Sequence, residues 1–204
     1  MLLAAKALSG GFVPVGAVAL SAEIFDAVFS SMVRAPIHGS TFSKNNLAMA
    51  AGIATLDVIE RENLVENAAK LGESILDDLR ALVDRYAFVK AVRGKGMMQA
   101  IEFGPPDGLK HRTAWKLLDK AQKGLFSQLV TVPLFKHHRI LSQTAGHDLP
   151  VVKFLPPLVI GDADRQWIAS AVDAVIADTE NVGGAIWDLG KNLASAALRT
   201  KAGR

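Results

Sequence analysis

A long amphipathic stretch in the middle of the chain places the strongest constraint on its fold. Apolar residues recur there at spacings of three and four, which predicts a helix with one apolar face. The residues of that face are Leu64, Ala68, Leu71, Ile75, Leu79 and Leu82. Asn63 and Glu66 form the pattern of a capping box at its start. Because a helix of this length can link two domains, we place a domain boundary after residue 83 and expect domains at 1–83 and 84–204.

The segments on either side of this helix predict a mixed α/β order. Before it we expect a buried strand at 2–5, a strand at 13–20, a helix at 22–32, a polar loop at 37–44 and a buried helix at 45–58. After it we expect strands at 88–93, 97–103, 129–134, 138–142 and 152–155, and helices at 113–127, from 162 onward and at 186–198. The C-terminal part therefore resembles a strand-rich α+β unit.

Composition narrows the functional classes. Half of the 204 residues are hydrophobic, which is enough for a substantial core. The net charge of +3 is small and the basic residues are scattered, so we expect no nucleic-acid partner. The apolar run around Lys6 is broken by glycine and proline and is too short to span a bilayer, so we expect no membrane partner. The lack of cysteine excludes a disulfide framework and fits a cytoplasmic location, which we expect.

Lys6 is the first candidate catalytic residue. It stands at the expected C-terminal end of a buried strand, where desolvation disfavours the ammonium and lowers its pKa. A neutral amine is a nucleophile that can form a Schiff base with an aldehyde cofactor. Gly10 and Gly11 allow a sharp turn beside it and leave room for a ligand. On the residues alone, the alternatives are a solvated surface lysine and an ordinary hairpin turn.

Two further segments carry groups suited to anions. Ser40 and Thr41 lie in a loop that leads into a helix, and hydroxyls beside the free N–H groups of a helix start favour a phosphate. The alternative is that Thr41 or Ser43 only caps the helix. Arg93 precedes a Gly-Lys-Gly turn, and its planar guanidinium can grip a substrate carboxylate with two hydrogen bonds. The alternative is an arginine that forms an ion pair at a strand end.

These three segments, in this order, resemble class III aminotransferases of the ornithine, acetylornithine and 4-aminobutyrate type. The matching segments are Ala4-Ala5-Lys6-Ala7-Leu8-Ser9-Gly10-Gly11, His38-Gly39-Ser40-Thr41-Phe42 and Val92-Arg93-Gly94-Lys95-Gly96-Met97-Met98. The resemblance implies a homodimer that uses pyridoxal 5'-phosphate to transfer an amino group from an amine or amino acid to a keto acid. It implies that Lys6 is catalytic and holds the cofactor. It further implies that Thr41, with Ser40, binds the cofactor phosphate of the neighbouring subunit and that Arg93 binds the substrate.

The resemblance also implies a fold and leaves alternatives open. The fold is the C-terminal part of a fold-type I PLP-dependent transferase: 1–83 is expected in the large cofactor-binding domain and 84–204 as a small α+β domain. The strand ending at Lys6 is then expected to be central in a largely parallel sheet. Family members are longer and begin upstream of Lys6, so we expect this chain to be truncated and inactive alone. An aminomutase of the same family and a non-catalytic remnant are the alternatives. We expect no metal site, because adjacent His137 and His138 point to opposite sides of a strand.

Overall fold

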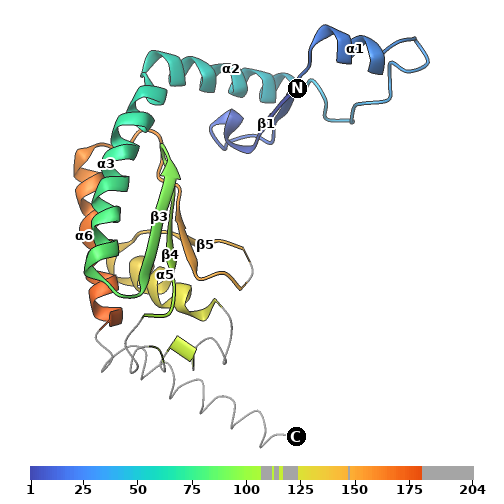
Figure 1. The fold of residues 1–204 in the computed structure, drawn as a ribbon. Coiled ribbons are helices and arrows are strands. Elements are labelled where there is room, and N and C mark those ends of the chain that lie inside the picture. The colour runs from blue at the N-terminus through green and yellow to red at the C-terminus, as the bar shows by residue number, and fades with distance from the viewer. Residues whose placement is uncertain (107–111, 113–114, 117–123, 147, 181–204) are drawn as a thin grey trace, which may run out of the picture. The chain divides into compact units, whose positions relative to one another are not determined.

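The computed structural model describes residues 1–106, 112, 115–116, 124–146 and 148–180 (Figure 1). The chain divides into two compact units, Met1–Val65 and Glu66–Arg204, named here the N-terminal unit and the C-terminal unit. The division falls near the start of the long helix, whereas the sequence places the domain boundary after residue 83. The assignment of 1–83 and 84–204 to domains of a larger fold stays a prediction.

The N-terminal unit contains a β-hairpin. Its elements are β1 (Leu2–Ala5), the 3₁₀ turn η1 (Lys6–Ser9), β2 (Gly16–Ala19), α1 (Ala22–Val28) and α2 (Asn46–Arg61). β1 and β2 pair antiparallel, with Leu2 opposite Ala19 and Ala5 opposite Gly16. The turn η1 packs against α2. The strands at 2–5 and 13–20 are thus confirmed as elements, although the second is shorter than expected, and α1 also ends earlier, at Val28.

Burial in this unit differs from the expectation. The strand ending at Lys6 is exposed and antiparallel, not buried in a parallel sheet, because β2 is its only strand neighbour among the described residues. The helix at 45–58 forms as α2, but Ala48 and Gly52 are its only buried residues. Many large apolar side chains of the unit are exposed: Leu2, Leu3, Phe12, Phe25, Met32, Val33, Ile37, Phe42, Leu47, Ile53 and Leu56. The apolar residues stand at the expected positions of these elements. No surface within the described residues covers them, so the burial expected for them is not seen.

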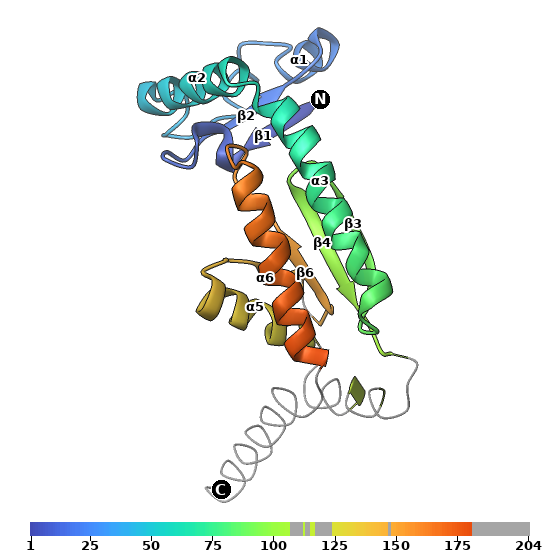
Figure 2. The same ribbon diagram turned by 90° about the vertical axis from the view of Figure 1, so that its left-hand side faces the viewer.

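The C-terminal unit is a four-stranded antiparallel sheet with helices packed on it. Its elements are α3 (Leu64–Arg85), β3 (Val89–Lys95), β4 (Met98–Phe103), α5 (Leu125–His138), β5 (Gln143–Thr144), β6 (Val151–Phe154) and α6 (Asp162–Glu180). The strand order is β3-β4-β6-β5. Helices α3 and α6 run side by side over one face of this sheet (Figures 1 and 2), and α5 packs against α6 and the β5–β6 edge.

The core of this unit follows the apolar patterns of the sequence. The predicted face of α3 is buried at four core positions: Leu71, Ile75, Leu79 and Leu82. The strand expected at 97–103 forms as β4, and its side chains alternate: Gln99, Ile101 and Phe103 are buried while Met98 is exposed. The core side chains of α6 are Ala171, Val172, Val175 and Ile176. Two amphipathic helices and one face of the sheet therefore exclude water together.

Polar contacts tie α3 to α6 outside the core. Arg165 of α6 reaches Asp78 of α3 at 2.8 Å, and Arg85 reaches Asp173 of α6 at 3.0 Å. Tyr86 also donates its hydroxyl to the Asp173 carboxylate. Partly exposed ion pairs of this kind each contribute about 0–1 kcal/mol, so they add little to the free energy of unfolding.

A charged cluster lies on the solvent side of α3. The Arg80 guanidinium donates to Glu73 at 2.6 Å and to Asp77 at 2.8 Å. These hydrogen bonds, the one to Glu73 first, raise the pKa of Arg80 above its ordinary value. The cluster marks the face of α3 that is turned away from the core.

Two elements near the middle of the unit differ from the prediction. The strand expected at 129–134 is wrong: these residues lie in α5, which contains Pro133. An uninterrupted apolar run suits a buried helix as well as a buried strand, and here it packs as a helix. The strand expected at 138–142 is also wrong, because His138 ends α5 and β5 begins only at Gln143. Most of the helix expected at 113–127 and all of the helix expected at 186–198 lie outside the described residues.

The β3–β4 turn touches α3 through glycine. A Cβ atom added to Gly72 of α3 would lie 2.5 Å from the backbone carbonyl of Gly96, so only glycine allows this approach. Gly96 itself has φ +55°, a left-handed conformation that favours glycine. The buried Gln99 side chain bridges the contact, since its Nε2 donates to Gly72 O at 2.9 Å and to Gly96 O at 3.0 Å. Gly96 of the β3–β4 turn, the last residue of the Gly-Lys-Gly segment, therefore provides the backbone contact with α3, whereas Gly94 and Lys95 lie in β3.

Gly72→Ala is expected to destabilise the protein by about 1–3 kcal/mol, because the added methyl forces α3 and the turn apart. In an ordinary helix interior the same change stabilises by about 0.5–1 kcal/mol, so the sign of the effect is diagnostic. Urea denaturation measures it as a lower midpoint at unchanged slope. Gly52→Ala is the matched control, because Gly52 also lies inside a helix, α2, and a Cβ atom there meets only Leu8 O, at the ordinary contact distance of 3.8 Å. A stabilising effect at Gly72 would contradict the close contact.

Candidate active-site residues

Lys6 lies on the turn that follows β1. It is the first residue of η1 and has φ +57°, a left-handed conformation that is uncommon for a residue with a side chain. Such a conformation costs on the order of 1 kcal/mol. The side chain is exposed, and its amine has no hydrogen-bond or ion-pair partner among the described residues. The strand-end position of Lys6 is as predicted, but the burial expected around it is absent here.

The turn after Lys6 is closed by its own hydrogen bonds. Gly10 N–H donates to Ala7 O at 2.9 Å, and Gly10 and Gly11 have φ +65° and +85°. Ser9 is buried, and its hydroxyl bonds the Val13 backbone, accepting from Val13 N–H at 3.2 Å and donating to Val13 O. The two glycines thus form the sharp turn expected from the sequence, in a loop that the Ser9 side chain closes.

The loop of Ser40 and Thr41 leads into α2 as expected. Asn45 caps this helix, because its Oδ1 accepts from Ala48 N–H at 2.8 Å. Ser43 instead turns back, and its hydroxyl accepts from Ser40 N–H at 2.8 Å. The alternative that Thr41 or Ser43 caps the helix is therefore wrong. The Thr41 hydroxyl is exposed and has no hydrogen-bond partner among the described residues.

Arg93 lies in the C-terminal unit on β3. Its guanidinium pairs with the Glu102 carboxylate of β4 at 2.7 Å, and both side chains are partly exposed. The pair is diagonal across the hairpin, since Arg93 stands opposite Ala100 and Glu102 opposite Ala91. This contact matches the alternative given for Arg93, an ion-paired arginine near a strand end. The exposed part of the guanidinium leaves room for a second carboxylate, so a substrate role stays a prediction.

The two adjacent histidines lie on a different element from the one expected. His137 and His138 lie in the last turn of α5, not on a strand. Across the described part of the chain, no three histidine or acidic side chains are grouped so that they could hold a metal ion. Nor does any helix there combine the length and the apolar character needed to cross a bilayer.

Known proteins share both the sequence and the fold. The family model "Aminotransferase class-III" matches residues 1–176. The chain belongs to the class III aminotransferase family. Ornithine aminotransferase of Saccharomyces cerevisiae is 36% identical over 167 residues, which are 81% of this chain and 34% of the yeast protein.

Solved structures of the family superpose on the chain. The ornithine aminotransferase of Toxoplasma gondii ME49 has a TM-score of 0.69 at 30% identity, covering 87% of this chain and 37% of that protein. An amine transaminase of an uncultivated Pseudomonas species, solved in its PLP-bound form, has a TM-score of 0.66 at 28% identity and covers 86% of this chain and 38% of that protein. The α/β fold expected for the class is thus confirmed. The chain spans about a third of the length of the curated relatives it matches.

Several residues that shape these segments were not found from the sequence. Gly72 and Gln99 fix the turn beside Arg93, and Ser9 closes the loop beside Lys6. A glycine inside a strongly periodic helix was the available signal for Gly72, because it has a cost there unless another backbone approaches. Glu102 gave no signal, since only strand register shows that it reaches Arg93.

Asn45→Ala is expected to destabilise the N-terminal unit by about 0.5–2 kcal/mol, because the first turn of α2 loses its cap. Thr41→Ala is the matched control and is expected to change stability by less than about 0.5 kcal/mol, as for an exposed side chain without a partner. Hydrogen exchange of the Ala48 amide, the donor in the cap, measures the local effect. Faster exchange in Thr41→Ala than in Asn45→Ala would show that Thr41 is the cap after all.

Proposed function

We propose that this chain carries the cofactor lysine, and part of the phosphate and substrate contacts, of a pyridoxal-phosphate-dependent aminotransferase. The reaction transfers an amino group from an amine or amino acid to a keto acid. The observation that carries the proposal is Lys6. Its amine is exposed, has no partner among the described residues and lies on a glycine turn at the end of β1, within a chain of the class III family.

The residues present fit this cofactor, which has an aldehyde and a phosphate. The Lys6 amine is free to react with an aldehyde. The Thr41 hydroxyl is free to donate to a phosphate, because Asn45 and Ser43 already make the local helix and loop contacts. Ser40 is a weaker contributor, since its backbone N–H is already donated to Ser43. Lys6 and Thr41 both lie in the N-terminal unit. We propose their roles from the reactivity of an amine toward an aldehyde and of a hydroxyl toward a phosphate.

Each residue then has one task. Lys6 would hold the cofactor covalently. Its released Nζ would take the proton from the substrate carbon that bears the nitrogen, as a base, and pass it to the cofactor, as an acid. Bound pyridoxal phosphate supplies a ring that withdraws electrons from that carbon. Thr41 orients the phosphate, and Arg93 orients the substrate through its carboxylate.

Assembly and location extend the proposal. We propose a homodimer in which Thr41 contacts the cofactor phosphate of the neighbouring subunit, as the family resemblance implies. A cytoplasmic location is supported by the complete lack of cysteine. We further propose that the 204-residue chain alone does not reach ordinary turnover, on the order of 1 per second or more. The support is the exposed apolar surface around the turn that carries Lys6. Steady-state transamination by the purified chain, with several amine donors and 2-oxoglutarate, tests this.

Lys6→Ala is expected to remove the fastest-labelled site and transamination together, because no other amine stands on this turn. Attachment is measured on the 204-residue protein by incubation with pyridoxal phosphate, reduction with borohydride and mass spectrometry of the modified lysines. Transamination is measured in a hybrid in which residues 1–176 replace the matching segment of the yeast ornithine aminotransferase.

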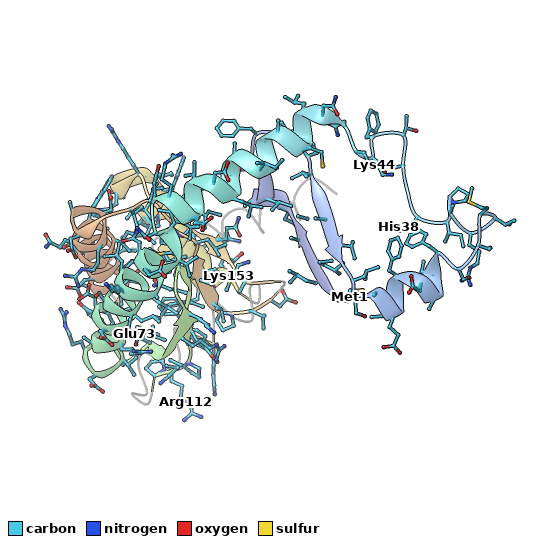
Figure 3. The ribbon with its side chains drawn as sticks, turned by 90° about the horizontal axis from the view of Figure 1, so that it is seen from above. Met1, His38, Lys44, Glu73, Arg112 and Lys153 are labelled. Atoms are coloured by element: carbon cyan, nitrogen blue, oxygen red, sulfur yellow. The ribbon has the colours of Figure 1, made fainter. Side chains whose placement is uncertain are left out.

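Lys44→Ala is the matched control for Lys6. Lys44 is also an exposed lysine with positive φ, +59°, in the same unit, in the loop that leads into α2 (Figure 3). Its substitution is expected to leave the labelling of Lys6 and the turnover unchanged. Normal turnover of the Lys6→Ala hybrid would refute the assignment of Lys6.

Arg93→Lys is expected to lower kcat/KM for carboxylate-bearing donors by roughly 1–3 kcal/mol in transition-state terms, because a point charge replaces a two-pronged donor. Donors without a carboxylate are expected to lose much less. Glu102→Gln is the control in the same hybrid, since it removes the ion pair but keeps the guanidinium. Equal losses for both donor classes in Arg93→Lys would show that the pair with Glu102 is the only role of Arg93.

A further inference from the structure

Ser9 is a buried hydroxyl beside Lys6 that the proposed function does not use. It lies at the end of η1, three residues after Lys6, and is only 1% exposed. Its Oγ accepts from Val13 N–H at 3.2 Å and donates to Val13 O. One side chain thus satisfies both backbone groups of the residue at which the chain leaves the turn. Such a closure holds the span between Ser9 and Val13 at a fixed width.

The closed loop borders a strained residue. Lys6 has φ +57°, and a left-handed lysine persists only where its surroundings hold it. On the N-terminal side the chain is held by the β1–β2 pairing, which ends with Ala5 opposite Gly16. On the C-terminal side it is held by the turn that Ser9 closes. Lys6 therefore lies between two held segments: the β1–β2 pairing before it and the loop after it, which the Ser9 side chain closes onto Val13. We call this Ser9–Val13 contact the Ser9 bracket.

Helix α2 also packs against this turn, in addition to the Ser9 bracket. Gly52 of α2 lies close to Leu8 O, and the Thr55 side chain lies near Gly10. The Thr55 hydroxyl donates to Ala51 O within its own helix. It is therefore not a donor to the turn. Backbone hydrogen bonds from Gly10 N–H to Ala7 O and from Phe12 N–H to Ser9 O also close the turn, and Ser9 adds the side-chain closure onto Val13.

We propose that Ser9 is a positioning residue for Lys6. Its hydroxyl, closed onto Val13, keeps Lys6 left-handed and thereby fixes the direction from which the amine meets an aldehyde. This inference rests on the proposed function of Lys6 as the cofactor lysine. Ser9 acts through the backbone and touches no ligand. A hydroxyl is needed because one group must both donate and accept: alanine does neither, whereas threonine can do both.

Two readouts on the 204-residue protein test the inference in Ser9→Ala and Ser9→Thr. The first is the backbone conformation of Lys6, from the Cα chemical shift and the HN–Hα coupling in NMR. The second is the rate at which pyridoxal phosphate, trapped with borohydride, labels Lys6 relative to Lys44. Lys44 is the internal control for both, because it is exposed and left-handed at φ +59° in the same unit.

The expected result separates the two lysines. In the wild type Lys6 is left-handed and is labelled faster than Lys44. In Ser9→Ala the left-handed signal of Lys6 is lost and the labelling ratio falls by about threefold or more, since a small misplacement of a reacting group lowers its rate strongly. Lys44 does not change, and Ser9→Thr recovers both readouts.

Other outcomes overturn one proposal or the other. If Ser9→Ala leaves Lys6 left-handed and the ratio unchanged, the positioning role is wrong while the function of Lys6 stands. If the wild type labels Lys6 and Lys44 equally, the proposed function of Lys6 fails, and the NMR readout alone decides whether Ser9 holds its backbone. Should Ser9→Ala unfold the unit, Lys44 changes as well, and Ser9→Cys, a weaker hydrogen-bonding group of similar size, replaces it. Identical behaviour of the cysteine and threonine variants would then overturn the role of the hydroxyl.

Discussion

The backbone of the β3–β4 turn rests directly on the backbone of α3, and the C-terminal unit is arranged around that contact. Gly72 and Gly96 approach so closely that a Cβ atom on Gly72 would overlap the Gly96 carbonyl. Gln99 stabilises this contact, because its Nε2 donates hydrogen bonds to the carbonyl oxygens of both glycines. The apolar side chains of α3, α6 and β4 then fill the space that this contact defines. Burial provides most of the stabilisation, while the glycine contact sets where the hairpin sits.

The same contact gives a physical meaning to the Val-Arg-Gly-Lys-Gly segment. Gly96 is required by the backbone approach to α3 and by its left-handed conformation, whereas Gly94 is required by the close approach of the β4 backbone at Met98. Arg93 stands at the edge of this turn and pairs with Glu102. The segment is therefore built first as a structural element. A carboxylate-binding task for Arg93 is compatible with it, because a surface ion pair is weak enough to exchange partners.

The N-terminal unit is held mainly by local hydrogen bonds, and few of its described residues form a core. Its hairpin, the Ser9 bracket and the Asn45 cap are all made between residues close in sequence. Few of its side chains are buried, and much apolar surface is exposed. Local hydrogen bonds of this kind can hold a strained lysine in place, but they add little burial energy.

Short-range patterns in the sequence were sufficient for much of this description. The glycine turn after Lys6 and the apolar face of α3 follow from neighbouring residues, as does the alternation in β4. The motifs around Lys6, Thr41 and Arg93 were sufficient for the family, since the class III model covers all three. The strand predicted at 129–134 was wrong because an apolar run fits a helix or a strand equally well. In the structure these residues form a helix, α5, that packs on α6.

The sequence alone determined the elements, the family and the candidate residues, because these depend on spacing and residue type. Only the tertiary structure decided which polar side chains already have a hydrogen-bond or ion-pair partner. Asn45, and not Thr41, caps α2, Glu102 pairs with Arg93, and Ser9 closes onto Val13. It also decided that the strand before Lys6 is exposed, against the sequence pattern. The physical reason is that burial and hydrogen-bond partners depend on which surfaces meet, and an apolar strand does not specify from its own residues what covers it.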